Sequence, residues 1–216
     1  MIDRGRRDRG QAFPIYIVVI TGMLFASLAF FVVGRGGIVR SNAQGAADAA
    51  ALAAAGEARD RVFLGLDLSG LTPEGWRRVA SGDLLTGRGA CEEAVVFAAR
   101  NGATADCQAQ IPLITVTATT NEAIGQSVVP GTDAMKGRAT AKALIKPQCE
   151  LRSVPTPVPT PAPTPTTPGQ TPSPSPSQGV GNVSFLCDGK PLTLDPAKPG
   201  SLTQLARRLF TVRLVD

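Results

Sequence analysis

The sequence of 216 residues contains no histidine, and it has one tryptophan and one tyrosine. Histidine is the commonest general base and metal ligand in proteins, and it usually activates a nucleophilic serine or cysteine. The adjacent carboxylates Glu92 and Glu93 are better explained as favourable charge in the first turn of a helix than as an acid/base pair. We therefore predict no enzyme activity, no catalytic residue, no cofactor or metal site and no small-molecule substrate.

Charge is also sparse, at 18% of residues, and the net charge is +5. The arginines are scattered or flank a hydrophobic run, and no aromatic residues are interleaved with them, so we expect no nucleic-acid partner. Most of the 18 prolines lie between Pro147 and Pro199. This uneven composition favours one modest domain with additional segments rather than two full domains.

The longest uncharged hydrophobic run covers residues 13–33, after a basic N-terminus at residues 1–12. A helix needs about 20 apolar residues to cross the bilayer core, and a lipid-exposed segment must be helical to satisfy its own backbone groups. The run therefore predicts a transmembrane helix, with a buried core helix as the weaker interpretation because the segment is so uniformly apolar. A single-pass membrane protein is expected.

Flanking arginines predict the orientation of this helix. Four precede it and two follow it closely: Arg4, Arg6, Arg7 and Arg9, then Arg35 and Arg40. The positive-inside bias places the N-terminus in the cytoplasm and the C-terminal domain outside the cell membrane. The alternative is a cleaved signal peptide, with small residues at 41–43 as a cleavage region, although the run is longer than a typical signal core.

Alanine dominates the next segment, residues 34–64, which we interpret as a stalk helix. Alanine is the best helix former, and its small side chain allows close packing on a sheet or on other helices. Gly34, Gly36 and Gly37 form a hinge in one interpretation. In the other, the helix runs straight through them at a cost of about 1 kcal/mol per glycine.

The N-terminal quarter resembles the Tad/Flp pilus-assembly proteins of the TadE/TadG type, in their actinobacterial form. The resemblance rests on residues 8–13 (DRGQAF), which lead into the hydrophobic run, and on residues 42–54 (NAQGAADAAALAA), which follow it. A weaker likeness lies in residues 97–103 (FAARNGA), followed by Cys107 and an alternating strand. The resemblance to this family implies pilus-assembly or secretion-system proteins, together with the membrane, as partners.

One position departs from the pilin-like members of that family. Those members carry a glycine followed five residues later by glutamate, which a prepilin peptidase reads, whereas Gly10 here is followed at that offset by Ile15. The hydrophobic run contains no acidic residue. The resemblance therefore implies an accessory assembly or surface component rather than the major pilus subunit.

Residues 65–152 are expected to form an extracytoplasmic α+β domain with an antiparallel sheet. A helix should start at Thr72 as N-cap with Pro73 first, and end at Gly82. A second helix is expected over residues 92–100, and alternating β-branched residues predict a strand over 114–119. A further strand is expected over 138–143. The predicted fold class is thus α+β: a long N-terminal membrane and stalk helix followed by this domain, with a proline-rich insertion.

Residues 153–178 repeat proline with threonine and serine, so we interpret them as an extended spacer. Residues 179–216 are predicted to contain strands over 183–187 and 211–215 around a short helix. So short a segment cannot bury much core alone, and we expect it to dock on the main domain.

The four cysteines lack the Cys-x-x-Cys spacing of zinc sites, and an even number in an oxidising compartment predicts disulfides. Three pairings are possible. We favour Cys91 with Cys107 and Cys149 with Cys187, which would bracket the spacer.

The function predicted from the sequence is that of a membrane-anchored, extracytoplasmic accessory or structural component of Tad/Flp pilus assembly or secretion. A secreted soluble binding protein, made by cleavage of the N-terminal segment, is the alternative.

Overall fold

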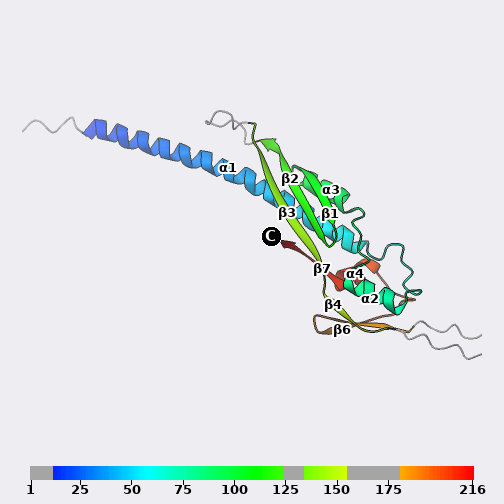
Figure 1. Ribbon diagram of the computed structural model, residues 1–216. Helices are drawn as coiled ribbons and strands as arrows, with labels where there is room; N and C mark the ends of the chain where they lie inside the picture. The colour runs from blue at the N-terminus through cyan, green and yellow to red at the C-terminus, as the bar shows by residue number, and fades with distance from the viewer. Residues whose placement is uncertain (1–11, 124–133, 155–180) are drawn as a thin grey trace, which may run out of the picture.

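The computed structural model describes residues 12–123, 134–154 and 181–216 (Figure 1). The predicted basic N-terminus and the proline-rich spacer lie almost wholly outside these residues. The elements in chain order are α1 (Ala12–Asp60), α2 (Pro73–Ser81), α3 (Ala90–Arg100), β1 (Ala103–Gln110), β2 (Leu113–Ala123), β3 (Lys136–Pro147), β4 (Cys149–Ser153), β5 (Val183–Cys187), β6 (Lys190–Leu194), α4 (Leu202–Leu209) and β7 (Phe210–Val215). This mixture of helices and strands confirms the predicted α+β class.

Two antiparallel sheets form the head, by which we mean the described residues from Ala43 onward. The larger sheet has strand order β1-β2-β3-β7, and the smaller has order β4-β5-β6. Only Gln148 separates β3 from β4, so the chain passes there from one sheet to the other. Helices α1 and α3 cover one face of the larger sheet (Figure 1). We call this the inner face and the opposite one the outer face.

The inner face of the larger sheet is apolar because buried residues alternate with more exposed ones along its strands, most clearly in β2. In β2, buried Ile114, Val116 and Ala118 alternate with partly exposed residues such as Thr117. Successive side chains of a strand point to opposite faces, so a strand with one buried face shows this period of two. The pattern predicted for residues 114–119 is confirmed, and the strand extends beyond both expected ends.

Helix α1 packs on the inner face through alanines, all of them at most 1% exposed: Ala43, Ala46, Ala47, Ala50, Ala51, Ala54, Ala55 and Ala58. Small side chains let the helix axis approach the sheet and α3 closely, so even methyl groups leave no gap. The segment interpreted from sequence as a stalk is therefore, from Ala43 onward, the central helix of the head. The part of α1 before Val39, which contacts β3 at Gly137, projects from it (Figure 1).

The projecting part of α1 continues into the head as one helix through Gly34, Gly36 and Gly37. Of the two interpretations of these glycines, the uninterrupted helix is the one observed. A helix that begins at Ala12 and ends at Asp60 would be about 70 Å long at 1.5 Å per residue. The projecting part and the central helix of the head are thus one continuous helix.

Helix α2 begins and ends where its capping residues predict. The Thr72 hydroxyl accepts a hydrogen bond from the Gly75 N–H at 3.2 Å, and Pro73 occupies the first turn. Gly82 closes the helix with φ of 86°, a left-handed conformation that glycine adopts without steric cost. Buried Trp76 contacts the Phe185 ring of β5 edge-on, with ring centroids 6.1 Å apart, so α2 packs on the smaller sheet.

Strands β1, β4 and β6 were not predicted. Their sequences (ATADCQAQ, CELRS and KPLTL) contain few β-branched residues, so local propensity is weak. Each is instead formed by pairing with a stronger neighbour, β1 with β2 and both β4 and β6 with β5. In addition, β7 pairs with β3, so the last described strand adds to the larger sheet.

Candidate functional site

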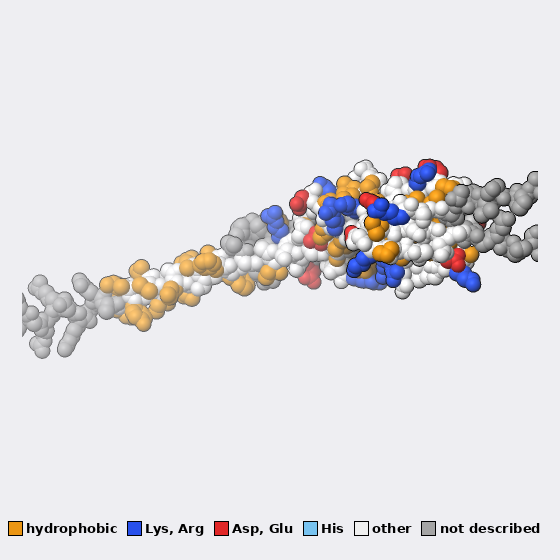
Figure 2. Space-filling view, turned by 90° about the horizontal axis from the view of Figure 1, so that it is seen from below, with side chains coloured by type: hydrophobic (Ala, Val, Ile, Leu, Met, Phe, Trp, Pro, Cys, Tyr) orange, Lys and Arg blue, Asp and Glu red, His pale blue; other side chains and the backbone are white. Residues whose placement is uncertain are grey.

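The projecting part of α1 is the most distinctive surface of the molecule. Residues Phe13–Phe31 have a mean hydropathy of 2.1, and none of this stretch is buried. Figure 2 shows hydrophobic side chains along the projecting helix, whereas acidic and basic side chains gather on the head. This is the one helix among the described residues that is long and apolar enough to cross a membrane, and a signal sequence would share these properties.

The helix enters the head beside the start of β3, at an unusually close contact. A Cβ atom placed on Gly137 would lie 2.5 Å from the carbonyl oxygen of Val39. The Gly137 N–H donates to the hydroxyl of Thr120 in β2, at 2.9 Å, so β3 is also held by its neighbouring strand. Glycine is required here because any side chain would push β3 away from α1.

Replacing Gly137 with alanine should therefore loosen the junction between α1 and β3. We expect a loss of about 1–3 kcal/mol in the free energy of unfolding, as for other overpacked sites. The measurement is chemical denaturation of the full chain in detergent micelles. Gly45→Ala is the matched control, because no atom lies within 4 Å of its added Cβ. An unchanged stability in Gly137→Ala would show that this close contact is not required.

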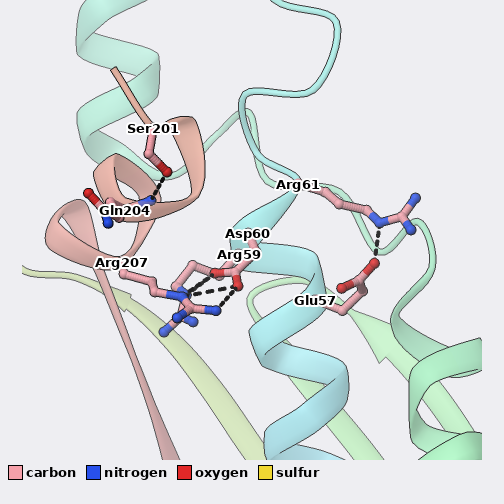
Figure 3. Close-up of polar contacts among 7 residues, drawn as sticks. All are labelled: Glu57, Arg59, Asp60, Arg61, Ser201, Gln204 and Arg207. Atoms are coloured by element: carbon pink, nitrogen blue, oxygen red, sulfur yellow. Dashed lines mark hydrogen bonds and ion pairs between the residues drawn. The ribbon is translucent and has the colours of Figure 1, made fainter. Parts of the chain in front are cut away.

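The far end of α1 is attached to α4 by an ion pair (Figure 3). The guanidinium of Arg207 donates to Asp60, with Nη2 2.8 Å from Oδ2 and Nε 3.2 Å from the same oxygen. Arg59 donates to Oδ1 of the same carboxylate at 2.8 Å. Helix α4 itself begins at Ser201, whose hydroxyl accepts from the Gln204 N–H at 3.3 Å. The pair thereby joins residues 147 positions apart in the sequence.

The environment of Asp60 determines its ionisation. Burial raises the pKa of its carboxyl, but the hydrogen bonds and charges of Arg207 and Arg59 outweigh burial and hold the pKa below its ordinary value. The same contacts raise the pKa of Arg207. The carboxylate is therefore ionised wherever the head is folded near neutral pH.

Asp60→Asn should destabilise the head by about 1 kcal/mol at pH 7, a modest loss because Arg207 is largely exposed to solvent. Because the folded pKa of Asp60 is lowered, its contribution is present above the ordinary aspartate pKa of about 4 and is lost as the pH falls through the folded pKa. The difference in melting temperature between the two proteins should accordingly shrink below about pH 4. Arg207→Gln is the control: combining it with Asp60→Asn should add little to either change alone. Additive losses would contradict the pairing.

Two disulfides connect elements of the head. Cys91 of α3 is bonded to Cys107 of β1, and Cys149 of β4 to Cys187 of β5. Cys149 and Cys187 lie directly opposite each other in the smaller sheet. The first bridge holds α3 against an edge strand, and the second joins the described segments on either side of residues 155–180.

The outer face of the larger sheet is polar and carries more positive than negative charge. Alternation along the strands places one acidic and five basic side chains on it: Asp106, then Lys136, Arg138, Lys142, Lys146 and Arg213. The hydroxyls of Thr117 and Thr140 are hydrogen-bonded across neighbouring strands at 2.9 Å. A pocket of about 550 Å³ lies where β7 ends, lined by Gln44 and Asp48 of α1 together with parts of β3 and β7.

Acidic residues and cysteines do not gather into a metal site anywhere in the described part of the chain. Glu92 and Glu93 lie in the first turn of α3, where sequence analysis placed them. The Asp60–Arg207 pair, the Val39–Gly137 contact and the pocket beside β7 were not predicted from the sequence. Each of these features joins residues far apart in the chain, so no local sequence pattern predicts it.

These features define a class of protein: an α+β head built on one long N-terminal helix whose exposed end is apolar. Residues 10–57 match a family model described as putative Flp pilus-assembly TadE/G-like, which confirms the resemblance drawn from residues 8–13 and 42–54. The match covers nearly all of α1, including both its projecting part and most of its buried alanines. Comparisons with curated proteins and with solved structures found no match.

Proposed function

We propose that this chain is a membrane-anchored accessory or structural component of Tad/Flp pilus assembly or of a related secretion system. The observation that carries the proposal is the division of α1. One end is exposed and apolar over Phe13–Phe31, and the other is buried as the central helix of the head. The family match covers this same helix. A helix of this kind would hold the head at a membrane surface in a fixed orientation.

In this proposal the N-terminus lies in the cytoplasm and the head lies outside. The arginines before the apolar run support this orientation through the positive-inside bias. An exterior location also suits four cysteines in two pairs, since disulfides persist in oxidising compartments. The role is non-enzymatic: the head would present a surface to pilus-assembly or secretion proteins.

Membrane fractionation with carbonate extraction tests the anchoring, because carbonate releases proteins that do not span the bilayer. We expect the intact chain to stay in the membrane pellet after carbonate extraction. In a separate experiment on intact cells, protease added outside should digest the head. Intact mass of the mature chain shows whether the N-terminal segment is retained. An extractable product lacking the first forty or so residues would instead support the secreted binding protein. The head would survive such a cut, because the buried alanines begin at Ala43.

A charge placed within the apolar run gives a sharper test of anchoring. Leu24→Lys should release a large fraction of the chain from the pellet, because a lysine near the helix centre costs about 2.5–3.5 kcal/mol in the membrane. Leu24 is exposed in the structure, so the head should keep its stability. Leu24→Ile is the matched control and should stay in the pellet. Equal retention of both variants would count against a membrane-spanning helix.

A further inference from the structure

Half of strand β3 has an edge that β7 does not cover. β7 pairs with β3 only over Lys142–Pro147. The preceding residues, 136–141, pair with β2 on one side and, among the described strands, with none on the other. An uncovered edge presents backbone donors and acceptors that can bind another strand.

Hydrogen bonds along β3 show which of its backbone groups face this edge. The N–H groups of Gly137 and Ile145 both donate toward the β2 side, to Thr120 and Pro112 respectively. Backbone groups of successive residues in a strand point alternately to its two sides. Arg138 and Thr140 therefore direct their N–H and C=O groups toward the uncovered edge.

Strand β1, at the opposite side of the same sheet, supplies the complementary edge. It pairs with β2 alone among the described strands. The carbonyl of Gly102 accepts from the N–H of Asn121, so even-numbered residues here point toward β2. Ala105, Cys107 and Ala109 consequently direct their backbone groups outward.

We propose that β1 of a second copy of this chain adds to the uncovered edge of β3, with residues 104–109 of one copy beside residues 136–141 of the other. β1 and β3 are parallel within one copy, because each is antiparallel to β2. Copies held through α1 in one membrane have the same direction, so the two strands would meet in parallel. This last argument rests on the anchoring proposed above.

This register satisfies the hydrogen-bonding pattern of a parallel pair. Arg138 lies beside Asp106 of the second copy, so its N–H and C=O meet the outward-pointing groups of Ala105 and Cys107. Outer-face residues lie beside outer-face residues throughout. Gln110, the last residue of β1, reaches the position of Lys142, where β7 begins to pair. The added strand fills the uncovered edge and stops where β7 starts.

Charge is complementary in the same register. Asp106, the one acidic residue of β1, would lie on the outer face beside Arg138, and both side chains are exposed in the single copy. The pocket of about 550 Å³ beside this edge leaves room for the approaching strand. Opposite charges on adjacent strands stabilise the pairing, whereas like charges oppose it.

An exposed apolar side chain lies near each of the two edges, that of β1 and that of β3. Val95 is 51% exposed and lies one turn after Cys91, whose disulfide to Cys107 ties this side of α3 to β1. Leu52 of α1 is 38% exposed and lies one turn after Asp48, which lines the pocket beside β3. Addition of β1 would carry α3 of the second copy toward α1 and cover both side chains.

The two edges are different surfaces, so the contact is head-to-tail. Each copy that donates β1 keeps its own β3 edge available, and a third copy can add in the same way. The contact therefore predicts a series of copies rather than a closed symmetric dimer.

Cysteine cross-linking in membranes from cells producing the full chain tests the contact. Gln108→Cys combined with Thr140→Cys places two thiols beside each other across the proposed pair, and keeps Asp106 and Arg138. Within one copy the two positions lie two strands apart, at least about 10 Å, which is beyond the reach of a disulfide. Mild oxidation should give a ladder of dimers, trimers and larger species on a non-reducing gel.

Three controls make the outcome specific. Neither single cysteine variant should give a ladder, and a dimer from either alone would indicate a symmetric contact and overturn the proposal. Gln108→Cys with Lys146→Cys should not cross-link between copies, because β7 covers that part of β3. Peptide mapping must show the two native disulfides intact.

Charge reversal in the double-cysteine background provides the second measurement. Asp106→Arg should lower the cross-linked fraction about tenfold, equivalent to about 1.4 kcal/mol. Adding Arg138→Asp should restore it by reversing the pair. No ladder in a folded double-cysteine protein, or a ladder insensitive to both charges, would overturn the contact. Carbonate extraction of the same membranes reports separately on anchoring, so the two proposals can fail independently.

Discussion

Ala50→Leu is expected to lower the free energy of unfolding of the head by about 2–3 kcal/mol and its melting temperature by about 5–10 °C. Ala50 is fully buried in the part of α1 that packs on the larger sheet and on α3. Its methyl group allows the close approach of these elements. Leucine adds three carbon atoms where no space exists, so the helix must move away from the sheet or the side chain must leave its preferred rotamer.

The comparison variant for this substitution is Ala49→Leu. Residue 49 is the next position of the same helix but is only partly buried, so the added carbons can extend toward solvent. Thermal unfolding of both full-length variants in the same detergent, followed by circular dichroism, measures the difference. Leucine tolerated equally at both positions would contradict the close packing on which the head is built.

Removal of the Cys149–Cys187 disulfide should cost about 4 kcal/mol, compared with about 3 kcal/mol for Cys91–Cys107. The reason is the length of chain that each bridge closes: the cysteines are separated by 38 positions in the first and 16 in the second. In the chain-entropy model a longer closed loop restricts the unfolded chain more. Cys149 also pairs directly with Cys187 in the smaller sheet, so its loss weakens the contact between β4 and β5.

Two double variants, Cys149→Ala with Cys187→Ala and Cys91→Ala with Cys107→Ala, should be compared by denaturation of the full chain. The conditions should be neither oxidising nor reducing. The order of the two losses is the informative quantity, because both variants are measured in the same detergent. A larger loss for the Cys91–Cys107 variant would show that loop closure does not govern the stability of the head. Peptide mapping of protein taken from the cell envelope tests whether the two pairings form there, which stays a prediction.

Local patterns predicted elements whose signals are contained in a few residues. Thr72, Pro73 and Gly82 placed α2 because a cap satisfies backbone groups within one turn. The alternation around Val116 placed β2 because a sheet with one buried face imposes a period of two. Strand β1 was not predicted because its alternating alanines have weak strand propensity, and only pairing with β2 makes it a strand.

The sequence by itself determined that the chain has an apolar helix over residues 13–33, continues in an alanine-rich helix and carries an α+β domain. Each of these properties depends on the period and size of neighbouring side chains. Only the tertiary structure decided that the alanine-rich segment is the centre of the head, that β7 joins β3, and that Asp60 meets Arg207. These depend on contacts between residues distant in the chain, whose partners are selected by how the whole core packs.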